Sequence, residues 1–492
     1  MIDVAVAGGG PVGMWLAAEL HRGGARPVVL ERRPERSPHS KALTLYPRTL
    51  ELFAMRGIAG RWLDEGTRLP SSHFAILPSR LDFTSLDTRF PFTLFLPQVR
   101  TEQLLEEHLA SLGVPYLRSH TVTGLRQDAD GVDLDVLTPS GPKEFRAAYV
   151  VGCDGGTSTV RRAAGIEFAG TPATWSTLVG DVELAEPPPE RALTLNLAGG
   201  SMYVLALGGG RYRIAAIDHA TLSNLTDAPA TFEELRAAVL RLAGTDYGMR
   251  DTADAWLSRV DNTTRQAAHY RQGRVFLAGD AAHIHYPAGG QGLNLGLQDA
   301  FNLAWKLAGA VRGWAPCWLL DSYHAERHSV GLEVVEDSLA QCALFANPSR
   351  EGIALRDRFS RLLATHPSLN AELAVRLAGL TVSYPDGGRR VPDLALRGAP
   401  SPSVFGLLSG ARFVLLDLAS RAGGGQAVSS APAAADGHSD RLSVVTAALA
   451  EDREDWAGVR SVLIRPDGHA AWSCGEDDHA AEPPLARWLG PG

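Results

Sequence analysis

Two stretches of the chain combine a strand-length apolar run with a helix of regular hydrophobic spacing. Residues 2–7 and 27–30 are apolar runs on either side of a helical pattern at 11–20. Residues 275–278 form an apolar run that fits a strand buried on both faces. The helical pattern that follows repeats at three- and four-residue steps from Leu293 to Val311. These patterns predict an α/β fold with a parallel sheet covered by helices.

The rhythm changes between residues 168 and 265, where strand-like segments dominate. They predict a separate, mainly antiparallel sheet, inserted into the first domain and interrupted by a helix at 232–242. An aromatic-rich segment at 74–95 is also expected to form sheet outside the first domain. Such a sheet can form one wall of a cleft for a large planar substrate, although its aromatic residues can equally be core. Its strands are expected at 177–184, 193–197, 202–207 and 212–217, and the candidate wall residues are Trp175, Met202, Tyr203 and Phe95.

Helical patterns continue to about residue 380, and a Pro-, Gly- and Arg-rich linker at 385–400 leads into a third domain. Strands are expected at 413–418 and 442–446, with a hairpin at 462–472 and a Gly/Ala/Ser-rich loop at 423–437. The predicted boundaries are 1–72, 97–170 and 265–385 for the first domain, 73–96 and 171–264 for the second, and 390–492 for the third.

The composition and charge of the chain limit the kinds of molecule that it can bind. The chain has 492 residues and a net charge of -8, with no basic cluster of the kind that binds nucleic acid or an anionic membrane. It lacks a run of 18 uncharged apolar residues and a basic leader, so we expect a cytoplasmic protein without a membrane partner. The four cysteines have no CxxC or zinc-ligand spacing, so we expect reduced thiols and no metal site.

A glycine-rich turn joins the first strand to the first helix. Residues 8–13 read GGGPVG, and Glu31 closes the second strand. This order fits a dinucleotide site, in which glycine backbone approaches a pyrophosphate and the acid binds a ribose hydroxyl. An acid at this position favours FAD or NAD over NADP. The alternative is a plain turn, because glycines mark turns in many proteins.

Two later motifs repeat the strand-then-aspartate arrangement. Residues 149–161, YVVGCDGGTSTVR, place Asp154 at a strand end and Arg161 in the following helix. Residues 273–300 place Asp280 at a strand end, before a Gly-rich loop at the mouth of a helix, where bare N–H groups favour negative charge. The alternatives are an N-cap aspartate with a surface arginine, and an ordinary strand–loop–helix joint. Lys41 and Arg48 are candidate partners of an anion or solvated surface charges.

Together the three motifs resemble the single-component (class A) flavin-dependent aromatic hydroxylases, which have the para-hydroxybenzoate hydroxylase-like fold. The resemblance covers essentially the whole chain. Within the family, the sequence resembles the branch that hydroxylates aromatic polyketides such as angucyclinones, with rifamycin monooxygenases as near relatives. It implies a Rossmann-like FAD-binding domain, an inserted β-sheet substrate domain and a C-terminal thioredoxin-like domain. That last domain lacks CxxC, because Cys474 stands alone, and is expected to be redox-silent.

The resemblance also implies which residues bind the cofactors. Leu293 and Asn294 are expected to use their backbone amides to stabilise the reduced flavin, and Arg213 and Tyr46 are candidate pocket residues. Asp154, Gly155 and Arg161 match a motif associated with FAD and with transient NAD(P)H docking. Lys41 stands where an arginine is common in the family. The implied FAD contacts are Gly8, Gly10, Pro11, Val12 and Gly13 at the pyrophosphate, Glu31 at the ribose, Arg32, Lys41, Gln98 and Arg100 nearby, Gly279 and Asp280 at the ribityl chain, and Pro287, Gly290, Gln291, Gly292, Leu293 and Asn294 around the isoalloxazine.

The implied activity is an NAD(P)H- and O₂-dependent hydroxylation of a polycyclic phenol or quinone through a flavin C4a-hydroperoxide. No second G-x-G-x-x-G motif is present, so NADPH or NADH is expected to visit a shared cleft. Two alternatives stay open: a Baeyer–Villiger oxygenase on the same scaffold, and a flavin-bearing protein that binds a polyketide without turnover. A homodimer is also left open.

Overall fold

The computed structural model describes residues 2–385, 388–418, 438–475 and 482–491. Its largest sheet has the strand order β20-β21-β11-β1-β2-β8, and β9 and β10 extend it through β11. The five strands from β21 to β8 run parallel, as the apolar runs predict. The strands are β1 (Ile2–Ala7), β2 (Pro27–Glu31), β8 (Tyr116–Arg118), β9 (Thr121–Gln127), β10 (Val132–Thr138), β11 (Gly141–Gly152), β20 (Arg271–Gln272) and β21 (Val275–Leu277).

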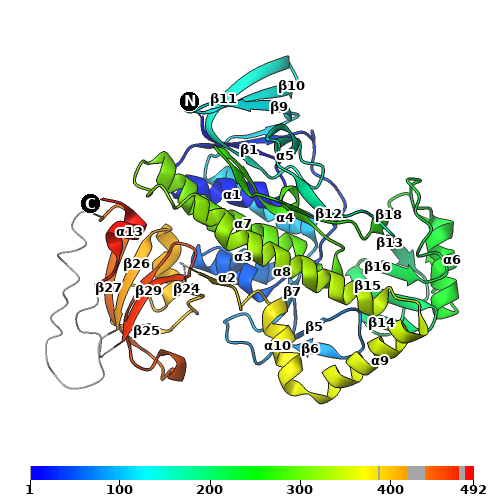
Figure 1. The fold of residues 1–492 in the computed structure, drawn as a ribbon. Helices are drawn as coiled ribbons and strands as arrows, with labels where there is room; N and C mark the ends of the chain where they lie inside the picture. The colour runs from blue at the N-terminus through cyan, green and yellow to red at the C-terminus, as the bar shows by residue number, and fades with distance from the viewer. Residues whose placement is uncertain (1, 386–387, 419–437, 476–481, 492) are drawn as a thin grey trace.

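Two long helices cross the middle of the molecule beside this sheet (Figure 1). They are α7 (Gly292–Val311) and α8 (Asp321–Phe345). Every residue of α7 from Asn294 to Gly309 except Gln298 is buried, so the expected single apolar stripe understates its burial. The other helices around the sheet are α1 (Pro11–Arg22), α2 (Pro47–Met55), α3 (Ala59–Glu65), α4 (Gln98–Ser111) and α5 (Thr159–Ala163).

The inserted sheet lies at one side of the molecule and is antiparallel throughout, which confirms the change of rhythm seen in the sequence (Figure 1). Helix α6 (Phe232–Ala243) covers it and begins with a capping box between Thr231 and Glu234. Its strands are β13 (Ser176–Leu184), β14 (Ala192–Leu197), β15 (Gly200–Gly208), β16 (Arg211–Asp218), β17 (Met249–Arg250) and β18 (Trp256–Asp261). A small sheet of β12 (Phe168–Thr171), β19 (Thr264–Ala267) and β22 (His283–Ile284) joins it to the parallel sheet.

The segment expected to form sheet at 74–95 contributes no strand to the inserted sheet. β5 (Ser71–His73) and β6 (Arg80–Asp82) pair only with each other, and β7 (Thr93–Phe95) pairs with β3 (Thr44–Leu45) and β4 (Thr67–Leu69). Ala75 and Ile76 both have left-handed backbone, with φ of 49° and 56°. Because this conformation is disfavoured for residues with a Cβ and cannot continue a strand, the aromatic run is broken there.

The C-terminal part is a mixed five-stranded sheet in the order β25-β27-β26-β28-β29, in agreement with the expected thioredoxin-like domain. The turn between β28 and β29 inserts Arg465 and Asp467, both fully buried, among the helices of the larger body. The predicted loop at 423–437 lies outside the described residues. The elements are β25 (Leu396–Arg397), β26 (Phe413–Leu418), β27 (Leu442–Leu449), β28 (Val459–Ile464), β29 (Ala470–Gly475), α11 (Val404–Leu407) and α13 (Leu485–Leu489).

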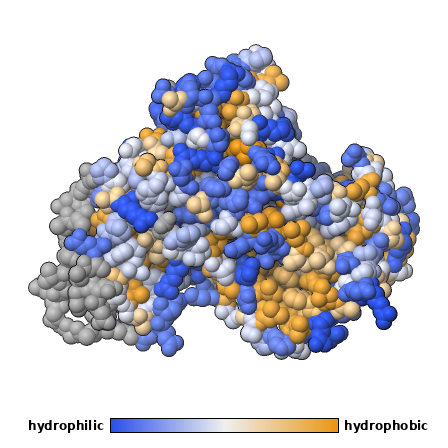
Figure 2. All heavy atoms as spheres, in the orientation of Figure 1, coloured by the Kyte–Doolittle hydropathy of each residue, from blue (hydrophilic) through white to orange (hydrophobic). Residues whose placement is uncertain are grey.

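Helices α9 (Arg350–Thr365) and α10 (Pro367–Leu377) extend from the end of α8. Hydrophobic side chains gather on the surface over α8, α9 and α10 (Figure 2). The exposed leucines on α8 and α9 are Leu332, Leu339, Leu355 and Leu362. Within the described ranges, none of the helices is both long enough and apolar enough to cross a membrane.

Candidate active site

The carboxyl ends of β1, β2, β11 and β21 meet at one edge of the parallel sheet, where ligands bind in this class of sheet. Glu31 ends β2, and Gly8, Asp154 and Asp280 follow β1, β11 and β21. A Cβ on Gly8 would lie 2.3 Å from the carbonyl oxygen of Cys153, so only glycine allows the first turn to approach its neighbour. The edge therefore brings the three motifs together.

The N-terminus of α1 is open toward this edge. Its N-cap, Gly10, provides no side-chain cap, and a Cβ on Gly10 would meet no atom within 4 Å. A Cβ on Gly13 would lie 2.0 Å from the carbonyl oxygen of Gly8, which explains the third glycine of the motif. Glu31 accepts hydrogen bonds from the amides of Gly9 (2.6 Å) and Arg33 (2.8 Å). Uncapped N–H groups beside a fixed carboxylate fit a pyrophosphate and a ribose.

The N-terminus of α7 is also uncapped by a side chain. Gly289 and Gly290 before it have φ of 67° and 66°, so the loop requires glycine at both positions. A Cβ on Gly296 would lie 3.0 Å from the Cα of Gly279 and 2.7 Å from Cγ2 of Val12. This close packing places the first turns of α1 and α7 beside the Gly279–Asp280 turn.

The side chain of Asn294 anchors the first turn of α7, a role that sequence reasoning missed because it considered only the backbone of this residue. Its Oδ1 accepts hydrogen bonds from the Tyr46 amide and the Thr49 hydroxyl, both at 2.8 Å. Its Nδ2 donates to the carbonyl oxygens of Thr44 (3.1 Å) and Gly290 (3.2 Å). The buried Tyr46 hydroxyl donates to the carbonyl of Gly289. Tyr46 therefore lies against the glycine loop.

Two buried acceptors at this edge have no hydrogen-bond partner in the described structure. Nδ1 of His285 donates to the Tyr286 carbonyl (2.7 Å), so Nε2 keeps its lone pair, and burial lowers the pKa of the ring. Oδ2 of Asp154 accepts hydrogen bonds from the Thr159 and Val160 amides at the start of α5, whereas its Oδ1 has no partner among the described residues. Buried acceptors require donors. The hydroxyl groups of FAD are such donors, so the residues present fit this cofactor. His285 belongs to the sequence HIH at 283–285, which was the available signal for this residue.

Several implied cofactor contacts lie at the surface of this edge. Arg32, Lys41, Asp280 and Pro287 are exposed, and Gly155 has left-handed backbone with φ of 85°. Gln98 holds the segment before β3, because its Oε1 accepts from the Ala42 amide at 2.9 Å. Arg100 is paired with Glu65 and Glu107. These placements leave the exposed side chains able to contact a ligand, whereas Gln98 and Arg100 already have protein partners.

Three arginines considered as ligand-binding residues are engaged with protein groups. Arg161 donates to the carbonyls of Ala281 and Gly156, both at 2.8 Å, and stacks on Phe168. Arg213 forms a bidentate pair with Asp181 (2.6 and 2.7 Å) and donates to the carbonyls of Ser40 and Lys41. Arg48 pairs with Glu51 and donates to the Asp467 carbonyl. In this structure all three connect segments of the chain.

A buried polar network supports the Gly279–Asp280 turn from behind. Asp299 accepts hydrogen bonds from the Gly279 amide (3.1 Å), His283 Nε2 (2.7 Å) and Arg327 Nε (2.8 Å). Arg327 also donates to the Tyr384 hydroxyl. This network could not be predicted from the sequence, because its members are far apart in the chain. In the part of the chain that the structure describes, no cluster of three or more His, Cys, Asp or Glu side chains is suited to a metal ion.

Aromatic side chains gather where the glycine loop meets the inserted sheet. The ring of Tyr286 lies 4.9 Å from that of Trp175 and 5.5 Å from that of Phe345. Tyr203 belongs to the same hydrophobic cluster, and the buried Tyr286 hydroxyl lies 3.0 Å from that of Thr177. Of the expected wall residues, Trp175 and Tyr203 join this cluster, whereas Met202 packs in the core of the inserted sheet and Phe95 lies on β7.

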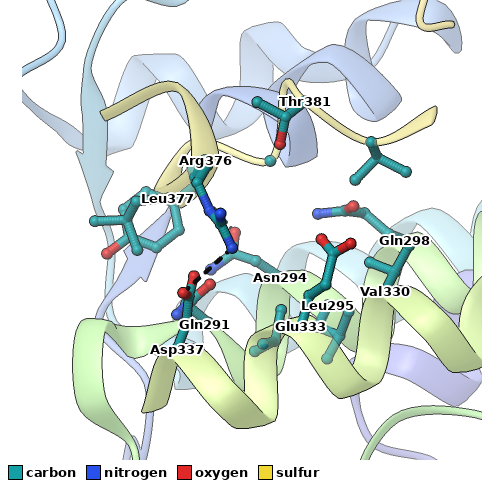
Figure 3. Close-up of a pocket in the computed structure, with 14 residues that line it drawn as sticks. Gln291, Asn294, Leu295, Gln298, Val330, Glu333, Asp337, Arg376, Leu377 and Thr381 are labelled. Atoms are coloured by element: carbon teal, nitrogen blue, oxygen red, sulfur yellow. Dashed lines mark hydrogen bonds and ion pairs between the residues drawn. The ribbon is translucent and has the colours of Figure 1, made fainter. Parts of the chain in front are cut away.

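A cleft opens on the other side of the first turn of α7 (Figure 3). Gln291 and Asn294 of α7 line it together with Glu333 and Asp337 of α8. Arg376 at the end of α10 reaches across the cleft to Asp337 (3.4 Å). Among the residues that the structure describes, the buried amide Nε2 of Gln291 has no hydrogen-bond partner. The cleft therefore borders the side-chain face of this turn.

The fold and the residues at this edge of the parallel sheet are those of a FAD-dependent aromatic hydroxylase, and comparison with known protein families agrees. Residues 1–338 match the family described as FAD binding domain, and residues 384–492 match the family described as aromatic-ring hydroxylase, C-terminal. The chain belongs to this family of flavin monooxygenases, which confirms the resemblance. FAD is its cofactor, with NAD(P)H and O₂ as co-substrates.

Relatives match along almost the whole chain. An uncharacterized aromatic compound monooxygenase, YhjG, of Bacillus subtilis is 43% identical over 99% of this chain and 98% of that protein. A rifampicin monooxygenase of Streptomyces venezuelae is 39% identical over 100% and 99%. The solved structure of the anhydrotetracycline hydroxylase OxyS from Streptomyces rimosus has a TM-score of 0.89 and 41% identity, covering 99% of both chains. A dialkyldecalin synthase of Streptomyces rugosporus is 38% identical over 99% of both.

Proposed function

We propose that this monooxygenase hydroxylates a polycyclic aromatic polyketide of the phenol or quinone type, in secondary metabolism. The observation that carries the proposal is the aromatic cluster around Tyr286, which lies between the glycine loop and the inserted sheet. Flat apolar side chains at this junction suit a large planar ring system. Relatives named for rifampicin and anhydrotetracycline support the same substrate class.

The bound FAD supplies the redox and oxygen-activating chemistry. The residues of this chain position and stabilise the reacting groups. The N–H groups at the start of α7, at Leu293 and Asn294, favour negative charge at the flavin edge by about 0.3–1 kcal/mol. Asn294 holds that turn in place through its four hydrogen bonds. The aromatic cluster excludes water, which protects the oxygenating species from wasteful decay.

Product analysis tests this function. Purified protein is incubated with FAD, NADPH or NADH and a panel of polycyclic phenols and quinones, and products are analysed by mass spectrometry. We expect substrate-dependent oxidation of the nicotinamide, matched O₂ uptake and a hydroxylated product. Absence of all three across the panel contradicts the proposal. A homodimer and a cytoplasmic location remain expectations, which light scattering and cell fractionation measure.

A second candidate rests on the dialkyldecalin synthase relative, whose name describes ring formation. It is a protein of this family that binds a polyketide and changes it without inserting oxygen. A product of unchanged composition supports this candidate, whereas a ring-expanded ester supports a Baeyer–Villiger oxygenase. Hydroxylation differs from both, because it adds one oxygen atom and retains the ring.

A further inference from the structure

The β5–β6 hairpin is attached to the glycine loop of the active site. Ser72 on β5 lies 3.3 Å from the hydroxyl of Tyr46, and that hydroxyl donates to the Gly289 carbonyl. His73 follows Ser72 and pairs across the hairpin with Arg80. These contacts place His73 and Arg80 next to the loop that precedes α7.

The same hairpin also contacts the inserted sheet, so it lies between the two walls of the site. The ring of His73 lies 6.3 Å from that of Tyr203 on β15 and is nearly parallel to it. The Asn196 amide on β14 donates to the carbonyl of Ile76. Figure 1 shows β5 and β6 beside β14 and β15. Ala75 and Ile76, which have left-handed backbone, lie at this contact with the inserted sheet. Such backbone often occurs at functional sites.

The hairpin carries polar groups without protein partners. Nδ1 of His73 is buried and has no hydrogen-bond partner in the described structure. The exposed side chain of Arg80 makes one hydrogen bond to the described residues, from Nε to the Ser71 hydroxyl at 2.9 Å, and no carboxylate among them forms an ion pair with it. Burial lowers the pKa of His73 to about 4 and raises the pKa of Tyr46 and of Tyr203. Near neutral pH, Arg80 is therefore the charged group of this set.

We propose that Arg80 and His73 form an anion subsite that binds an ionised phenol or enol oxygen of the aromatic substrate. The inference rests on the proposed function and specifies which form of the substrate binds. An unpaired guanidinium favours an oxyanion, and the neutral imidazole can donate a second hydrogen bond to it. On binding, the phenol releases its proton to solvent. The phenolate is more electron-rich than the phenol, which prepares the ring for an electrophilic oxygen.

Absorption spectroscopy on the FAD-loaded protein without NADPH tests the subsite separately from turnover. The probe is alizarin, a polycyclic phenol whose absorption moves to longer wavelength on ionisation. We expect the wild type to bind alizarin as the phenolate at a pH where the free dye is still protonated. Arg80→Gln should weaken binding about tenfold to a hundredfold and abolish the red shift. The exposed Arg358, on α9, provides a matched control, and Arg358→Gln should change neither.

Variants of His73 add a positional test. His73→Asn keeps a polar group near the Nδ1 position and should retain most of the red shift, whereas His73→Leu should lose it. Flavin content and melting temperature establish that each variant is folded. Any of three results would overturn the subsite. The wild type does not bind alizarin, it binds alizarin in the protonated form, or Arg80→Gln and Arg358→Gln give equal spectra. A protein that shows the shift but oxidises no substrate retains the subsite and contradicts the proposed hydroxylation.

Discussion

Asn294 is the residue on which the geometry of the flavin end depends most directly. Its amide contacts β3, α2 and the glycine loop at once, through hydrogen bonds to Thr44, Tyr46, Thr49 and Gly290. The backbone N–H groups of the same turn are those expected to face the flavin. One side chain therefore holds the turn whose backbone N–H groups are expected to face the flavin.

Asn294→Ala should leave the protein folded but destabilised by about 2–4 kcal/mol, because several buried hydrogen bonds are lost. We expect more hydrogen peroxide per NADPH oxidised, since the first turn of α7 is no longer held. Thr49→Val removes only one of the four bonds and should show a smaller effect. Peroxide release and thermal unfolding measure both. Equal coupling in Asn294→Ala and the wild type would contradict this role.

Asp280 and Gly290 separate cofactor retention from oxygen transfer. Asp280→Ala should lower FAD retention, because the exposed carboxylate that follows β21 is the group expected to accept from the ribityl chain. Gly290→Val puts a β-branched side chain at φ of 66°, with Cβ 3.2 Å from the Thr44 hydroxyl. That variant should still bind FAD but uncouple or abolish hydroxylation. FAD fluorescence and product yield are measured, and full activity in both variants would remove this loop from the mechanism.

Among the elements, those with a clear hydrophobic period were predictable from the sequence. The strand at 413–418 and the helix that begins at 232 occur as expected. The break at Ala75 and Ile76 was not predictable, because neither residue type favours left-handed backbone and only tertiary contacts maintain it. The glycines of the site could be identified, since each has a local steric reason. The polar partners of Asp299 and Asn294 could not, because they come from remote segments.

Glu326 on α8 connects this helix to α7 and to the C-terminal turn. It accepts hydrogen bonds from Lys306 (2.8 Å), Asn302 (2.7 Å) and Arg465 (2.7 and 2.8 Å). Glu326→Gln leaves Lys306 buried without its carboxylate and Arg465 paired with Asp467 alone, and should cost about 3–5 kcal/mol of stability. Glu333→Gln, at an exposed position of the same helix, is the control and should be neutral. Unfolding in urea measures both, and equal midpoints would contradict the role of the network.

The same carboxylate predicts how stability depends on pH. Burial alone would raise the pKa of Glu326, but Arg465 and Lys306 outweigh it and hold the pKa at about 2, below the usual 4.5. A carboxyl with a lowered folded pKa stabilises the protein above its unfolded pKa, and that stability is lost as the pH falls toward the folded value. We therefore expect the melting temperature to fall between pH 4.5 and 2, and to fall less steeply in Glu326→Gln. Parallel curves would contradict this assignment.

At the scale of the whole molecule, the parallel sheet, the inserted sheet and the C-terminal sheet all contribute to one arrangement around α7. The parallel sheet and α1 meet its first turn, the inserted sheet faces the glycine loop before it, and the C-terminal turn contacts its later residues through Asn302 and Trp305. The C-terminal sheet therefore has a structural role beside the parallel sheet.

Isotope labelling in ¹⁸O₂ tests the central claim most directly. The FAD-loaded protein is supplied with NADPH and a polycyclic phenol that stimulates NADPH oxidation, and the product is analysed by mass spectrometry. The structure predicts one ¹⁸O atom per product molecule, on an intact aromatic ring, with one NADPH consumed for each. A product without the label, or a labelled ring-expanded ester, would contradict the assignment of this site as an aromatic hydroxylase.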